Sequence, residues 1–154
     1  MKTLRIICII ALILGIAVTG YAVEKRSAKI TSLNGTAEIK PIGQAVWSPA
    51  SAGMVMNEGD TLKTAPGSWA LVDIDNGKVA MVEVKEGSQM SLAELTADPQ
   101  TDTSQTLLDL AMGEVLIKAQ KIHGENSRFE VKTPTSIVGV RGTTFNVKVE
   151  SVEE

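Results

Sequence analysis

The chain has 154 residues, a formal net charge of −3, one histidine, one cysteine and only 3% aromatic residues. Its basic residues are scattered singly, so the sequence shows neither a phosphate-tracking stripe nor a base-stacking platform, and we expect no nucleic acid partner. The shortage of histidine and cysteine argues against the usual zinc and copper sites, and no cofactor motif occurs.

The first 22 residues have the features of a signal peptide. Lys2 and Arg5 precede an uncharged apolar stretch, and Gly20-Tyr21-Ala22 supplies the small residues that a signal peptidase recognises. Cleavage after Ala22 would release a periplasmic or secreted protein without cysteine. The alternative is an uncleaved anchor that holds the protein in the inner membrane, facing the periplasm. Residues 23–27 predict a loose tether.

From Ala28 onward, Gly and Pro recur at a spacing typical of short strands in an all-β domain. Residues 30–40 predict two strands joined by an Asn34-Gly35 turn. Residues 41–52 predict a loop that Trp47 anchors as its one large apolar side chain.

The clearest predicted hairpin covers residues 69–84, with Asn76-Gly77 as a type I′ turn. That turn pairs Ile74 with Val79 and makes both faces of the hairpin largely apolar. We therefore expect structure on both sides of it.

Residues 96–106 are polar and predict a long exposed loop. Residues 107–122 are ambiguous, because their composition favours helix whereas residues 115–119 fit a strand and Gly113 interrupts the segment. We favour two strands over a helix. Residues 151–154 predict a solvated tail.

The last part of the chain predicts two alternating strands around a stiff corner. Phe129 and Val131 face one way, and Thr133-Pro134 ends that strand because proline removes a ladder donor. A β-branched run follows from Ile137, and alternation resumes after the Arg141-Gly142-Thr143 segment.

This C-terminal string resembles the signature of the FecR domain, an extracytoplasmic module of bacterial envelope proteins. The segments 58–64, 68–72 and 75–78 resemble the central pattern of that family, in the same order. The resemblance covers residues 28–150. It implies an all-β domain of about ten short strands, packed as two antiparallel sheets or as a solenoid-like stack.

Two motifs of the resemblance supply the candidate structural or binding residues: Gly59, Asp60, Thr133, Pro134, Arg141, Gly142 and Thr143. We expect the stem of Arg141 to be partly buried and its guanidinium to pair with Asp60, with Asp73 as second choice. The alternative is that Arg141 binds an anionic ligand. We expect left-handed backbone or close strand approach at Gly59 and Gly142.

Trp47 and Trp69 are interpreted as core residues. Their alternative role is that of a ligand platform, which would require at least one of them to be exposed.

No catalytic constellation is visible, and we expect a non-enzymatic protein without cofactor or metal. His123 is interpreted as a surface turn residue, and Asp73 and Asp75 do not match a calcium-binding loop. Known FecR proteins relay signals across the envelope to a sigma factor. Because the chain shows no cytoplasmic segment before its apolar stretch, we expect an isolated exported module that binds an envelope protein in signalling or assembly. The alternative partner is a cell-wall or surface polysaccharide.

Overall fold

The structure is a computed structural model and describes residues 26–121, 124 and 126–150. These residues form twelve strands and no helix, which confirms the all-β prediction. The strands are β1 (Ala28–Asn34), β2 (Ala37–Lys40), β3 (Ser48–Pro49), β4 (Val55–Met56), β5 (Thr61–Thr64), β6 (Trp69–Ile74), β7 (Ala80–Val84), β8 (Gln89–Asp98), β9 (Thr103–Ala119), β10 (Arg128–Lys132), β11 (Ile137–Gly139) and β12 (Thr144–Val149). A helix with the length and apolar character of a membrane span is not found in this part of the chain.

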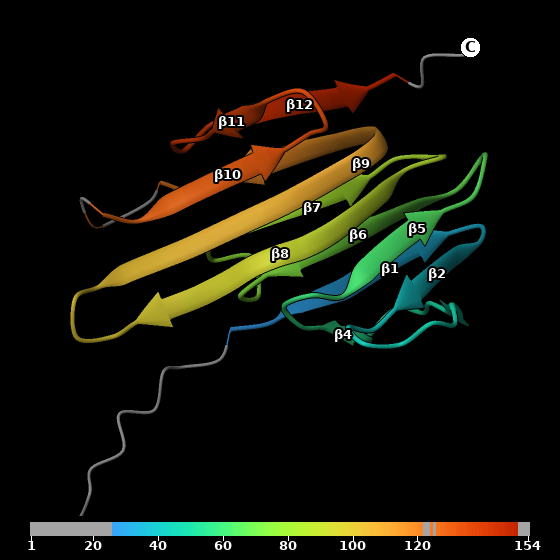
Figure 1. The fold of residues 1–154 in the computed structure, drawn as a ribbon, viewed down its shortest axis with the longest axis horizontal. Helices are drawn as coiled ribbons and strands as arrows, with labels where there is room; N and C mark the ends of the chain where they lie inside the picture. Colours follow the sequence, from blue (N-terminus) through green and yellow to red (C-terminus); the bar gives the residue numbers. More distant parts are fainter. Residues whose placement is uncertain (1–25, 122–123, 125, 151–154) are drawn as a thin grey trace, which may run out of the picture.

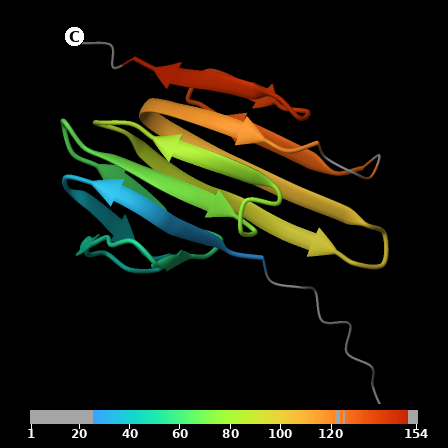
Figure 2. The ribbon, with the colours of Figure 1, turned by 180° about the vertical axis from the view of Figure 1, so that it is seen from behind.

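The strands form one strongly curled, open sheet whose two halves face each other (Figure 1, Figure 2). Its path runs β3-β2-β5-β8-β9-β7-β6-β1-β4, with β10 and β12 attached to β9 and with β11 attached to β10. One layer holds β2, β5, β8, β10 and β11, the other holds β1, β6, β7 and β12, and β9 contributes to both. Every pairing is antiparallel except that of β9 with β10, which is parallel.

The core lies between the two layers and is built from alternate residues of the strands. In β10, Phe129 and Val131 are buried while Lys132 is exposed, as the alternation predicted. The long central strand contributes Leu108 to one layer and Ile117 to the other, and both side chains are fully buried. Burial of apolar area at about 25 cal/mol per Å² is the main force that holds such layers together.

Strand β9 passes from one layer to the other at Gly113. Its first part pairs with β8 and β10, and residues 113–119 pair with β7 and β12. Gly113 has φ +87°, and a Cβ there would overlap Ser88. The Ser88 hydroxyl accepts a hydrogen bond from the N–H of Glu114 at 2.8 Å. The expected break at Gly113 is therefore a bend within one strand.

The β6–β7 hairpin has a longer turn than predicted. Asp75, Asn76 and Gly77 all have positive φ, and Ile74 pairs with Ala80. The predicted pairing of Ile74 with Val79 is wrong by one residue. Such a slip exchanges the two faces of a strand relative to its partner. As a result, the buried apolar residues of the hairpin share one face and the other face is only partly covered, so the expectation of structure on both sides is also wrong.

The polar segment 96–106 is not a long loop. Strand β8 continues to Asp98 and β9 begins at Thr103, which leaves a short turn between them. Residues 107–119 belong to β9, so the preference for strand over helix is confirmed, but they form part of one strand and the expectation of two strands is wrong.

Asn34-Gly35 turns the chain, with φ +79° at Gly35, but it does not close a hairpin. Strand β1 pairs with β4 and β6, whereas β2 pairs with β3 and β5. The turn therefore carries the chain from one layer to the other.

The described chain begins with a buried arginine. Arg26 is 7% exposed, and its Nε lies 2.6 Å from Oδ2 of Asp75 in the β6–β7 turn. Its Nη1 donates to the carbonyl groups of Thr96 and Gln105 at 3.0 and 3.1 Å. Arg26 therefore links the β6–β7 turn of one layer to β8 and β9.

The expectation of a loose tether is thus wrong for Arg26. The predicted signal peptide, its cleavage site, His123 and the predicted tail at 151–154 lie outside the described residues.

Candidate functional site

The signature segment begins with the expected corner. Strand β10 ends at Lys132, and Thr133-Pro134 follows. Thr133 is buried, and its Oγ1 accepts a hydrogen bond from the N–H of Ser136 at 3.1 Å. The threonine thus closes the turn into β11, which confirms that Thr133-Pro134 ends the strand.

Arg141 and Asp60 do not form the predicted pair. Arg141 is exposed, while Asp60 is buried and accepts hydrogen bonds from the N–H groups of Ile42 and Asn57 at 2.9 and 2.8 Å. Asp60 therefore fixes the backbone on both sides of residues 43–56. The predicted burial of Arg141 is wrong because the segment after Val140 leaves the core at the end of the sandwich.

Gly59 and Gly142 have φ +89° and +62°, so left-handed backbone is confirmed at both. A Cβ on Gly59 would overlap the side chain of Ile42, and one on Gly142 would lie 3.1 Å from Cα of Lys121. The carbonyl of Thr143 accepts a hydrogen bond from Ala119 at 3.1 Å. Gly59 and Gly142 thus allow tight turns of the backbone, and Thr143 bonds the backbone after β11 to the end of β9.

The β-branched run after Pro134 is exposed instead of buried. Ile137 is 62% exposed and Val138 is 38% exposed, and only Val140 of this run is buried. Strands β11 and β12 lie at the outer end of the two layers (Figure 1, Figure 2). The part of the FecR-like signature that contains Ile137 and Val138 therefore lies on the surface of the protein.

A hollow of about 330 Å³ lies beside this surface and is lined in part by Arg128, Glu130, Gly139 and Arg141. Among the described residues, neither arginine forms an ion pair. The alternative interpretation of Arg141, as a group that can bind an anion, fits this position better than a structural one.

The core interpretation of the two tryptophans is wrong. Trp69 is 40% exposed, and Trp47 is only partly buried outside the core. The ammonium groups of Lys40 and Lys63 lie 5.1 and 4.5 Å from the centroid of the Trp47 ring. Two cations thus lie at cation–π distance from Trp47, whereas no lysine or arginine of the described residues lies over the Trp69 ring.

Trp69 borders a groove of about 630 Å³ that also contains Glu83, Lys85, Glu86 and Glu114. Lys85 lies 3.0 Å from Glu114 and holds the pKa of that carboxyl below its usual value. The Glu83 carboxylate makes no ion pair with any other described residue. The groove, which we call the Trp69 groove, thus combines an aromatic face with a free carboxylate.

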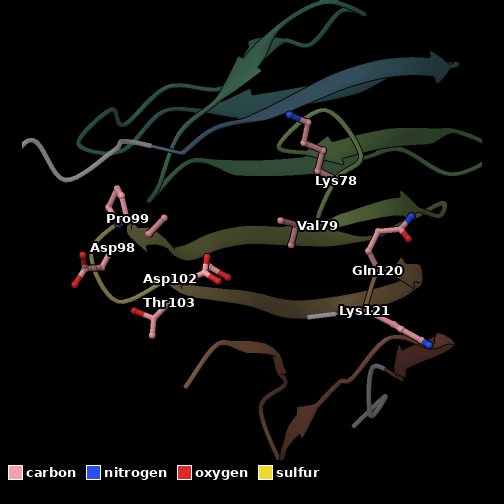
Figure 3. A pocket seen from close by; sticks show the side chains of 10 residues that line it. Lys78, Val79, Asp98, Pro99, Asp102, Thr103, Gln120 and Lys121 are labelled. Atoms are coloured by element: carbon pink, nitrogen blue, oxygen red, sulfur yellow. The ribbon is translucent and has the colours of Figure 1, made fainter. Parts of the chain in front are cut away.

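A third hollow, of about 440 Å³, lies where the β8–β9 turn meets the end of β9. Asp98 and Asp102 lie at one end of it, and Lys78 and Lys121 lie at the other (Figure 3). The N–H of Gln100 donates to Asp98 and holds the pKa of that carboxyl below its usual value. The two carboxylates are thus separated from the two lysines across the hollow.

Sequence reasoning missed Arg26, Arg128 and Gly139. Nothing marks Arg26 in the sequence, because its partner and its carbonyl acceptors come together only in the fold. The pairing of β10 with β11 could have placed Arg128 and Arg141 at the same end of these strands. Within residues 26–121, 124 and 126–150, no group of three or more His, Cys, Asp or Glu side chains is placed to hold a metal ion.

The fold and these surfaces define a two-layered all-β module with an uncovered edge at one end. The model of the family described as "FecR protein" matches residues 60–153. The match covers more than half of the chain, and the chain therefore belongs to the FecR family, as the signature implied. Searches of curated proteins and of solved structures found no match.

Proposed function

We propose that this protein is a non-enzymatic, extracytoplasmic binding module that contacts another protein in bacterial envelope signalling or assembly. Family membership supports the envelope setting. The observation that carries the proposal is the exposure of Ile137, Val138 and Arg141 within the family signature. Adjacent exposed apolar side chains beside an unpaired charge are typical of a surface that a partner covers.

Site-specific crosslinking in living cells tests this proposal. A photoreactive amino acid at position 137 should form an adduct with one envelope protein, and the same amino acid at exposed position 100 should not. Equal adducts at both positions, or none at position 137, would contradict it.

The proposed export has its own measurement. The N-terminal sequence of protein extracted from the envelope should begin at Val23. A product that retains Met1 in the membrane fraction would instead indicate the anchored form facing the periplasm.

A second candidate function is the binding of cell-wall or surface polysaccharide, and the exposure of Trp69 favours it. A sugar ring can stack on an indole face while carboxylates such as Glu83 accept hydrogen bonds from its hydroxyl groups. Sedimentation with isolated cell-wall material measures such binding. Trp69→Ala should abolish co-sedimentation and Trp47→Ala should not, whereas equal binding by both variants would exclude the Trp69 groove.

A further inference from the structure

The backbone of β11 points some of its hydrogen-bonding groups away from the rest of the sheet. The N–H of Val140 donates to the carbonyl of Phe129 at 2.8 Å, which fixes the phase of the β10–β11 ladder. Because bonded and non-bonded pairs alternate in an antiparallel ladder, Val138 also directs its N–H and C=O toward β10. The backbone groups of Ile137 and Gly139 therefore point outward.

No described strand covers this outward edge, since β11 pairs with β10 alone in this part of the chain. The face of β11 is open at Gly139, because a Cβ built there would meet no atom within 4 Å. An unpaired edge with exposed apolar residues can accept a further strand. A partner backbone could approach β11 closely at Gly139.

Two positively charged residues, Arg128 and Arg141, lie near one end of this edge and could bind an anion. The β10–β11 register ends at Glu130 and Gly139, and Arg141 lies in the bend that follows, at the end of the sheet where Arg128 begins β10. Arg128 and Arg141 line the same hollow as Glu130, and neither arginine forms an ion pair with Glu130 or with another described residue. Neighbouring like charges repel each other, and a carboxylate between them would relieve that repulsion.

We propose that β11 receives an extended segment of a partner protein as an additional strand. The segment has an apolar side chain beside Ile137 on the outer face of the sheet and, on the same face, a carboxylate that binds Arg128 and Arg141. This mode of binding rests on the proposed function and specifies its surface and its partner chemistry. The strand edge spans Ile137–Gly139 and Arg141 lies two residues beyond it, so a segment that reaches both is about five residues, or roughly 17 Å, long.

A second copy of the chain fits this edge less well. Pairing β11 with another β11 would bring four arginines to the edge, from Arg128 and Arg141 of each copy. A foreign segment with an acidic residue instead supplies the missing charge.

The test is a selection of ten-residue peptides from a random display library on the purified full-length protein. Selected peptides should alternate apolar residues and carry an acidic residue toward one end. Gly139→Pro should weaken their binding at least tenfold, because it removes an outward N–H that β10 does not use. Gly139→Ala keeps that N–H and should bind as the wild type does.

Two further variants identify the edge and the charge. Arg141→Glu, at an exposed position, should weaken the selected peptides at least tenfold and should favour peptides with lysine or arginine. Asn146→Pro is the matched control on β12, which pairs with β9 alone. The N–H of Ala119 donates to the carbonyl of Thr143, so the N–H of Asn146 points away from β9.

The proposal is overturned if no peptide is selected, if Gly139→Pro binds as well as Gly139→Ala, or if Asn146→Pro is the variant that loses binding. Self-association that Gly139→Pro abolishes would show a second copy as the occupant, and would also overturn it. The proposed function and strand addition can be distinguished. If an envelope protein is crosslinked from position 137 and Gly139→Pro does not affect its capture, the proposed function stands and strand addition is refuted.

Discussion

At the scale of single residues, two buried charges serve structure while the signature arginine does not. Asp60 accepts two backbone hydrogen bonds, and Arg26 binds Asp75 and two carbonyl groups. A buried charge needs such partners because leaving water without them costs several kcal/mol. Arg141 is exposed to solvent. The arginine that stabilises the fold is therefore Arg26, near the start of the domain, and not Arg141, near its end.

Arg26→Ala should lower the free energy of unfolding by about 2–3 kcal/mol. This is less than the loss typical of a fully buried pair, because the Asp75 side chain is 25% exposed. Denaturant unfolding measures the change, and Arg141→Ala is the control, with an expected loss below about 0.5 kcal/mol. Asp75→Asn added to Arg26→Ala should cost little more, since the pair acts as a unit and asparagine also tolerates the left-handed backbone at position 75. Fully additive losses would contradict the pairing.

Single residues were harder to predict than patterns. The sequence shows Arg141 within a β-branched run, and a buried stem was the natural inference. What it does not show is that the run lies on the last strand of a layer, where a β-branched residue such as Ile137 meets solvent.

At the scale of elements, the alternation of apolar and polar residues correctly predicted strands β10 and β12. The turn residues between β6 and β7 did not predict the correct turn length. The Asn76-Gly77 pair signals a two-residue turn, but Asp75 also adopts the left-handed conformation and lengthens it. Aspartate tolerates that conformation, so the sequence alone could not fix the register. The polar composition of residues 96–106 wrongly indicated a loop. These residues lie largely in strands, where most of their side chains are only partly buried, so polar residues are tolerated there.

Gly113→Ala should destabilise the protein by about 2–4 kcal/mol. The substitution places an L residue at φ +87°, which strains the backbone, and its Cβ would overlap Ser88. Thermal unfolding measures the loss, and Gly139→Ala is the matched control at an open glycine with no positive φ. Equal melting temperatures for the two variants would show that β9 does not need its bend.

At the scale of the whole molecule, different kinds of strand form the two ends of the curled sheet. Strands β3 and β4 come from one short stretch of chain and end the sheet path on opposite layers. At the other end, β11 and β12 leave two edges uncovered (Figure 1). The all-β class followed from turn spacing, but this asymmetry depends on long-range pairing that spacing does not encode.

Amide hydrogen exchange of the free protein measures whether the outward edge of β11 is uncovered. The N–H groups of Val138 and Val140 should be protected by their bonds to β10, while those of Ile137 and Gly139 should exchange at rates close to those of an unstructured peptide. Protection of all four amides in the free protein would show that another strand already covers β11, and would contradict the account.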